Sequence, residues 1–200
     1  MKHCPFTSIC TGGICDKSCP TFAEISYLLE RNCLLESKDV YRTVLKERDS
    51  ILKAIHAAEG KLACVISPTT IETGNLYTYC AICENWKGNQ LHCSVYRLKF
   101  LKYIETLQGS FNTKEPPESL EMENIFAEQA KILIITNIDF VKFTDFHSQK
   151  LLSIIHSRLD AGLSTIIVSP KLNTLVGSGA VRFKNWRSAR LSERRMTTVS

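Results

Sequence analysis

The sequence contains no long hydrophobic run. No segment approaches the roughly 20 apolar residues that a membrane-spanning helix needs, and the stretch 1–6, Met-Lys-His-Cys-Pro-Phe, lacks the apolar core of a signal peptide. We therefore expect a cytoplasmic protein with no membrane partner. The hydrophobic fraction of 44% and the charged fraction of 22% are those of a globular chain. The net charge of +5 is too small to indicate a partner by itself.

Repeats and familiar catalytic patterns are also missing. The sequence shows no internal repeat, no low-complexity tract and no Ser-His-Asp or Cys-His arrangement. The number of cysteines, nine, is odd and the N-terminal stretch is not a signal peptide, so a secreted disulfide framework is disfavoured. In a reducing cytosol, clustered cysteines are more often metal ligands or catalytic thiols.

Four cysteines cluster near the N-terminus without any Cys-x-x-Cys knuckle of the kind common in structural zinc sites. Their spacing is Cys4-x5-Cys10-x4-Cys15-x3-Cys19. Four thiolates on one short loop suit a tetrahedral zinc or an iron–sulfur cluster, and Cys19-Pro20 resembles the end of ferredoxin-type runs. The alternative is that these thiols are free or that only some bind. A separate pair, Cys80 and Cys83, lies in an apolar helical stretch, and we expect core packing there.

Residues 61–175 alternate between short aliphatic runs and helical patterns. Strands without polar alternation are buried on both faces, which predicts a parallel sheet covered by helices on both sides. A polar stretch with two prolines at 109–118 predicts a surface loop. The expected strands are 62–67, 91–96, 132–136 and 165–168, and the expected helices are 37–58, 76–86, 98–107 and 146–159.

The patterns divide the chain into three parts. Residues 1–35 form a four-cysteine metal-binding module with a helix starting at Thr21, residues 36–60 a linking helix, and residues 61–200 an α/β domain with a basic C-terminal tail.

A degenerate phosphate-binding loop follows the first expected strand. A functional loop has the sequence Gly-x4-Gly-Lys-Ser/Thr. Its glycines let the backbone amides approach the phosphates, its lysine neutralises the phosphate charge, and its hydroxyl binds magnesium. Here Gly74 keeps the second glycine, whereas Thr69, Asn75 and Leu76 replace the first glycine, the lysine and the hydroxyl. Glu72 adds negative charge where phosphates would lie, so ATP binding is disfavoured.

A second ATPase motif is also altered. The aliphatic strand 132–136 should end in a magnesium-binding acid and a catalytic acid, but Thr136 and Asn137 stand there. A hydroxyl and an amide supply neither charge for the metal nor a base for water. Asp139 is the nearest carboxylate and is displaced along the chain. We therefore expect no ATP hydrolysis and no catalytic residues.

The order of these elements from residue 61 to about 175 resembles the AAA+ domain of bacterial replicative helicase loaders of the DnaC and DnaI type and their IstB-type transposition relatives. Segments 74–88 and 154–169 carry the resemblance. It implies a P-loop NTPase-like, AAA+-type α/β fold, with Arg158 in the place of the arginine that reaches a neighbouring subunit's nucleotide. Pro170 stands where the sensor asparagine would be.

The resemblance also implies partners: a replicative helicase or a transposition protein, docked through a cysteine-bearing N-terminal module, and self-association. The predicted function is that of a non-hydrolysing accessory protein of DNA replication or mobile elements. The alternatives are a metal-cluster nucleic-acid-binding protein and a redox or cluster-dependent enzyme on an unrelated α/β fold, such as a flavodoxin-like one.

The C-terminal tail is basic. A helix over 186–195 would carry four arginines that could neutralise nucleic-acid phosphates, although chain ends are also commonly frayed. These DNA-binding candidates are Arg187, Arg190, Arg194 and Arg195.

Overall fold

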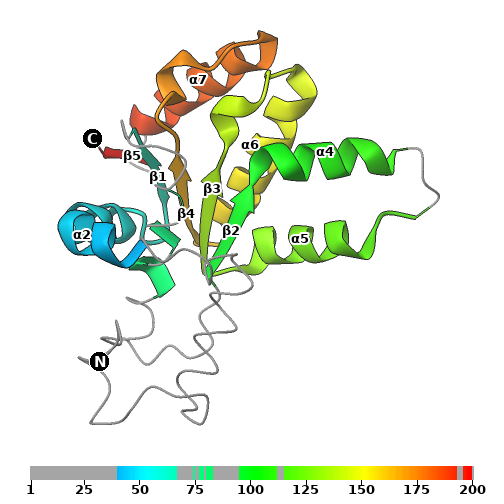
Figure 1. Ribbon diagram of the computed structural model, residues 1–200. Helices are drawn as coiled ribbons and strands as arrows, with labels where there is room; N and C mark the ends of the chain where they lie inside the picture. Colours follow the sequence, from blue (N-terminus) through cyan, green and yellow to red (C-terminus); the bar gives the residue numbers. More distant parts are fainter. Residues whose placement is uncertain are drawn as a thin grey trace, which may run out of the picture.

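A five-stranded, fully parallel sheet forms the centre of the protein, with the strand order β2-β3-β4-β1-β5 (Figure 1). The computed structural model describes residues 40–66, 74, 77–78, 80–82, 95–111, 115–192 and 196–199. The strands are β1 Leu62–Val65, β2 Val95–Lys99, β3 Ile132–Thr136, β4 Ser164–Val168 and β5 Met196–Val199. The predicted parallel sheet is confirmed, and the expected strand 132–136 matches β3 residue for residue.

Helices cover both faces of the sheet, as the aliphatic strands predicted. They are α2 Val40–Ala57, α4 Phe100–Ser110, α5 Glu118–Gln129, α6 Asp145–Asp160 and α7 Ser178–Ser192. One face, which includes Cys64, Leu98 and Ile135, packs against residues of α4, α5, α6 and α7. The opposite face, which includes Val65 and Ile134, packs against α2 and the helical residues 77 and 80–82. Burial of apolar side chains in these two clusters stabilises the fold.

Helix α2 is part of the α/β unit and does not stand apart as the linker predicted for residues 36–60. Ile51, Ala54 and Ile55 are buried in the same cluster as the β1 residues Ala63 and Val65. The turn after the helix reaches β1 through Gly60, whose positive φ of 61° favours glycine. The helix therefore covers the sheet directly.

Helices α4 and α5 form an antiparallel pair beside the sheet (Figure 1). The loop predicted at 109–118 is shorter in the structure, because α4 continues to Ser110 and α5 starts at Glu118. Helix α5 was not predicted from the sequence. The Tyr103 hydroxyl of α4 donates a 2.8 Å hydrogen bond to Asn124 Oδ1 of α5, which ties the two helices together.

The basic tail folds back onto the sheet. Helix α7 starts at Ser178, earlier than predicted, and packs against α6 with Phe183 fully buried. Phe183 stacks between the rings of Phe143 and Trp186. Strand β5 then pairs with β1, with Leu62 opposite Met196. The alternative interpretation of this tail as a frayed end is therefore wrong for residues 186–192 and 196–199.

Candidate functional site

The carboxyl ends of β1, β3 and β4 meet at one edge of the sheet, where ligands bind in open α/β folds. The chain leaves β1 for the distant strand β2, and leaves β4 for β5 on the other side of β1, so the connections diverge between β1 and β4. The register aligns Val65 of β1 with Val168 of β4, and Ile135 of β3 with Ile167 of β4. Residues that follow these strands therefore line a common edge.

Gly74 lies directly against the end of β3. A Cβ atom placed on Gly74 would be 2.5 Å from Thr136 Cγ2, and the Thr78 hydroxyl donates a 2.7 Å hydrogen bond to the Gly74 carbonyl oxygen. The structure thus brings together the surviving glycine of the first motif and the first position of the second. Three further predicted positions, Thr69, Asn75 and Leu76, lie outside the described residues.

Arg97 of β2 completes this cluster, and the sequence analysis missed it. Its side chain is 8% exposed, and its Nε donates a 3.2 Å hydrogen bond to Thr136 Oγ1. The same guanidinium approaches Gly74, since a Cβ there would lie 3.0 Å from Arg97 Nη2. The sequence signal for it was an arginine within a short run of strand-forming residues, which indicates a charged side chain that is partly or fully buried.

The described residues at this edge do not fit a magnesium nucleotide. Thr136 and Asn137 carry no carboxylate, and the guanidinium of Arg97 places a positive charge beside Thr136, where a divalent cation would have to bind. Asn137 adopts a left-handed conformation, with φ of 62°, which turns the chain into the short helix η1 Ile138–Phe140.

Asp139, the nearest carboxylate, binds the loop that follows β4. Ser169 donates a 3.0 Å hydrogen bond to Asp139 Oδ1, and the Lys171 amide donates to Ser169 Oγ at 3.1 Å. These contacts link the loops after β3 and β4. Asp139 therefore has a role in holding two loops together.

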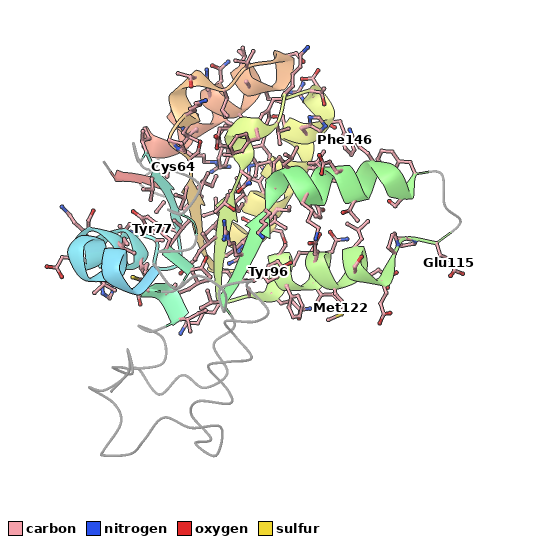
Figure 2. All side chains as sticks on the ribbon, in the orientation of Figure 1. Cys64, Tyr77, Tyr96, Glu115, Met122 and Phe146 are labelled. Carbon is pink, nitrogen blue, oxygen red and sulfur yellow. The ribbon has the colours of Figure 1, made fainter. Side chains whose placement is uncertain are left out.

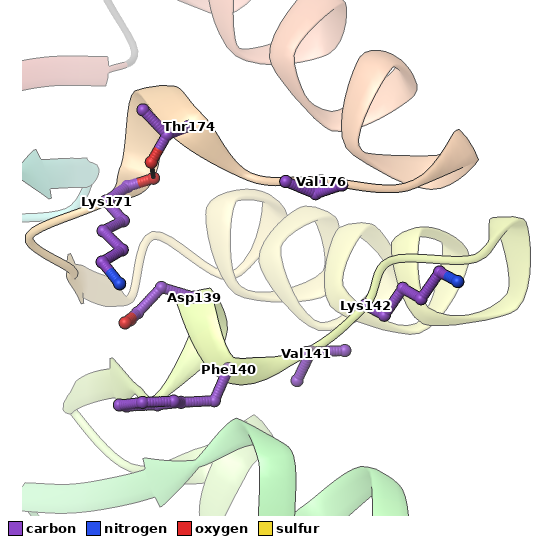
Figure 3. A pocket seen from close by; sticks show the side chains of 7 residues that line it. All are labelled: Asp139, Phe140, Val141, Lys142, Lys171, Thr174 and Val176. Carbon is purple, nitrogen blue, oxygen red and sulfur yellow. Dashed lines mark hydrogen bonds between the residues drawn. The ribbon is translucent and has the colours of Figure 1, made fainter.

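A groove of about 480 Å³ lies beside this link, between the loops after β3 and β4 (Figure 3). Phe140 and Val176 are 54% and 71% exposed at its walls, and Lys142 and Lys171 are exposed at its rim. The other lining residues are Asp139, Val141 and Thr174. Exposed apolar side chains together with two exposed lysines suit an amphipathic, acidic ligand.

The prediction that Arg158 reaches a neighbouring subunit is wrong, because its side chain is 0% exposed and its hydrogen bonds lie within this chain. Its Nε donates to Thr165 Oγ1 at 2.9 Å, and its Nη2 to the Ser164 carbonyl at 2.6 Å. Its Nη1 donates to the carbonyls of Ala127 and Glu128. Burial lowers its pKa to about 10, so it stays protonated at neutral pH. Arg158 joins α6, α5 and β4 within one chain.

Two of the four tail arginines are on α7. Arg187 and Arg190 are half-buried, whereas Arg194 and Arg195 lie outside the described residues. The positive charge of Arg187 lowers the pKa of Cys64, but burial of that thiol dominates and raises its pKa to about 12. The charge of Arg187 thus acts on a buried side chain of the core. DNA binding by the four tail arginines stays a prediction.

The four-cysteine cluster Cys4, Cys10, Cys15 and Cys19 lies outside the described residues. Within the described ranges, no group of three or more His, Cys, Asp or Glu side chains is placed to hold a metal ion. Cys80 is buried among Ile82 and Val95, which confirms core packing for that residue, whereas Cys83 is not described. None of the described helices is long and apolar enough to span a membrane.

The strand order defines the class of fold. In a flavodoxin-like sheet β1 lies between β2 and β3, but here β1 lies between β4 and β5, so that alternative is excluded. The structure is similar to the replication initiator DnaA bound to AMPPCP and single-stranded DNA, with a TM-score of 0.50 at 8% identity, covering 78% of this chain and 46% of that chain. The likeness to that chain concerns the fold alone, a parallel α/β sheet covered by helices on both faces.

A second structure, AMPPCP-bound DnaA from Aquifex aeolicus, matches with a TM-score of 0.45 at 10% identity, covering 92% of this chain and 52% of that chain. The chain thus spans about half the length of the DnaA chains that it resembles. No protein-family model matches the sequence. The search of curated proteins finds no significant match.

Proposed function

We propose that this protein is a non-hydrolysing, helicase-loader-like accessory factor of DNA replication or of mobile elements, which acts by binding a protein partner. The observation that carries the proposal is the cluster of Gly74, Thr136 and Arg97 at the carboxyl edge of an AAA+-type sheet. The scaffold of an ATPase is kept, while the place of its metal-binding acid is taken by a threonine bonded to a buried arginine.

This combination favours binding over catalysis. Phosphoryl transfer on such a scaffold depends on carboxylates that hold magnesium and orient water, and Thr136 and Asn137 supply neither function. The buried Arg97 of β2 instead donates a hydrogen bond to Thr136 of β3, and its guanidinium lies close to Gly74. An edge that is held together in this way and lacks the carboxylates for phosphoryl transfer is suited to binding a partner.

The N-terminal cysteines are the proposed docking module. Zinc or an iron–sulfur cluster at Cys4, Cys10, Cys15 and Cys19 would order a segment with little apolar content, since metal-binding energy is folding energy for such loops. We propose that the module docks on the replicative helicase or on a transposition protein. The basis is the resemblance of the α/β domain to helicase loaders, whose N-terminal modules have this role.

The test is a binding titration of the purified full chain against the host's replicative helicase and, separately, against a transposition protein of the host. We expect saturable binding of one of them, lost when Cys10 and Cys15 are both replaced by serine and retained in Cys64→Ala, where a buried core cysteine is changed. Absence of binding to both, or ATP turnover that is sensitive to substitution of Thr136 or Asn137, would contradict the proposal.

DNA is a second ligand to test. The neighbouring DnaA was solved with single-stranded DNA, and this chain carries four tail arginines and a net charge of +5. Contacts with phosphates predict an affinity that falls steeply with salt. Replacing Arg190, Arg194 and Arg195 with glutamine should abolish binding of an oligonucleotide if the tail is the contact.

A further inference from the structure

The outer face of α5 carries two exposed apolar side chains and two exposed glutamates. Met122 and Ile125 are 42% and 43% exposed, one helical turn apart, and Met122 points away from the body of the protein (Figure 2). Glu118 and Glu121 are exposed on the same side of the helix. We call these four residues the α5 face.

The groove between the loops after β3 and β4 has the opposite charge. Phe140 and Val176 form its exposed apolar walls, and the exposed Lys142 and Lys171 stand at its rim. Its one lining carboxylate, Asp139, accepts the hydrogen bond from Ser169. The groove therefore offers exposed apolar side chains and two exposed lysines, which complement the apolar side chains and glutamates of the α5 face.

We propose that the α5 face of one copy docks into the groove of a second copy. An amphipathic helix binds a groove through anchors three or four residues apart, and Met122 and Ile125 have that spacing. The groove volume of about 480 Å³ accommodates two such side chains. Glu118 and Glu121 then face Lys142 and Lys171, which selects this orientation.

Binding within one molecule is excluded by the topology. Helix α5 ends at Gln129, just before the first residue of β3, so it lies toward the amino edge of the sheet. The groove follows the last residues of β3 and β4, at the carboxyl edge. The bond between Tyr103 and Asn124 holds α5 in its hairpin with α4, away from the groove.

Two different surfaces produce a head-to-tail contact, and repeated head-to-tail contacts give open chains or rings. A single helix in a groove is a small interface, so the association should be weak and dependent on concentration. It requires neither nucleotide nor Arg158. It is also independent of the external partner in the proposed function.

The test is sedimentation velocity of the full chain, from low to high micromolar concentration, with two charge-reversed variants. One carries Glu118→Lys and Glu121→Lys, and the other carries Lys142→Glu and Lys171→Glu. Each variant alone sets like charges opposite each other, and we expect its association to weaken by at least about tenfold. An equal mixture restores opposite charges at every contact, so we expect association to return.

The matched control reverses two exposed acids outside both surfaces, Glu59→Lys and Asp160→Lys, and should associate as the wild type does. All six changed positions are exposed, so the fold should be unaffected, and circular dichroism checks this. The inference is overturned if the wild type stays monomeric at every concentration, if both variants associate normally, or if the mixture stays monomeric. A failure here leaves the helicase titration unaffected.

Discussion

Arg97 Nε and Thr136 Oγ1 are 3.2 Å apart, and this hydrogen bond joins neighbouring strands at the edge where an AAA+ ATPase would use a carboxylate. Thr136 is buried and Gly74 lies against its methyl group. The hydroxyl thus serves as an acceptor for a buried cation, and its methyl group fills the space beside a helix. Both roles differ from the binding of magnesium.

The contact between Gly74 and Thr136 predicts the effect of adding one methyl group. Gly74→Ala would place a Cβ 2.5 Å from Thr136 Cγ2, so we expect a loss of about 1–3 kcal/mol in the free energy of unfolding. Urea denaturation measures it. Gly109→Ala is the control: nothing lies within 4 Å of its Cβ, and a gain of roughly 0.5–1 kcal/mol is expected in this helix.

The clash should be relieved from the other side of the contact. Thr136→Ser removes the Cγ2 methyl and keeps the hydroxyl that accepts from Arg97, so combining it with Gly74→Ala should recover part of the lost stability. Strict additivity of the two single substitutions would show that the residues are not in contact.

The buried position of Arg158 predicts a structural phenotype. Arg158→Met leaves the carbonyls of Ala127 and Ser164 without their donor, and we expect a loss of about 1–3 kcal/mol in the free energy of unfolding. Arg182→Met is the control, because Arg182 is exposed and its Nε forms a long surface ion pair of 3.9 Å with Asp145 Oδ1. This substitution should change the free energy of unfolding by no more than about 1 kcal/mol. Equal stability of the two variants would refute the structural role.

Glu123 predicts a pH dependence. Burial raises the pKa of this carboxyl, with Lys102 acting in the opposite direction, so the folded state prefers the protonated form. A penalty therefore appears as pH rises through the unfolded-state value of 4.5 and is complete above the folded-state pKa. Glu123→Gln should raise the melting temperature at neutral pH and have no such benefit in acid. The exposed Glu121→Gln should give little change at either pH.

The four N-terminal cysteines predict a bound metal in the full chain. Anaerobic purification followed by elemental analysis should find about one zinc, or iron with a visible absorption band, per chain. Replacing Cys4 and Cys19 with serine should remove the metal, whereas Cys64→Ala should retain it. A chain without zinc or iron, with all four thiols reactive, would contradict metal binding.

Local sequence signals predicted much of the fold. The aliphatic run of β3 is buried on both sides of the sheet, and its predicted bounds match because every residue in it is apolar or β-branched. Helix α6 was found within one residue at each end, since its apolar residues recur at helical spacing. In α5 the signal was weak: two prolines precede it and its outer face carries Met122 and Ile125.

The tail shows where local reasoning failed. Arginines after Trp186 suggested an exposed helix. Helix α7 is instead anchored by Phe183, whose buried ring stacks on Phe143, forty residues earlier in the sequence. The last strand, β5, exists by pairing with β1. Such pairing is a property of two distant segments and leaves no pattern in either one.

The alternation of strands and helices, and the absence of the ATPase motif side chains at Asn75, Thr136 and Asn137, follow from the sequence, because residue identity and periodicity are local. The hydrogen bond from Arg97 to Thr136 and the burial of Arg158 could be found in the folded protein alone, because an arginine can be buried where other segments supply acceptors for it. The same arginine would be exposed wherever those acceptors were absent.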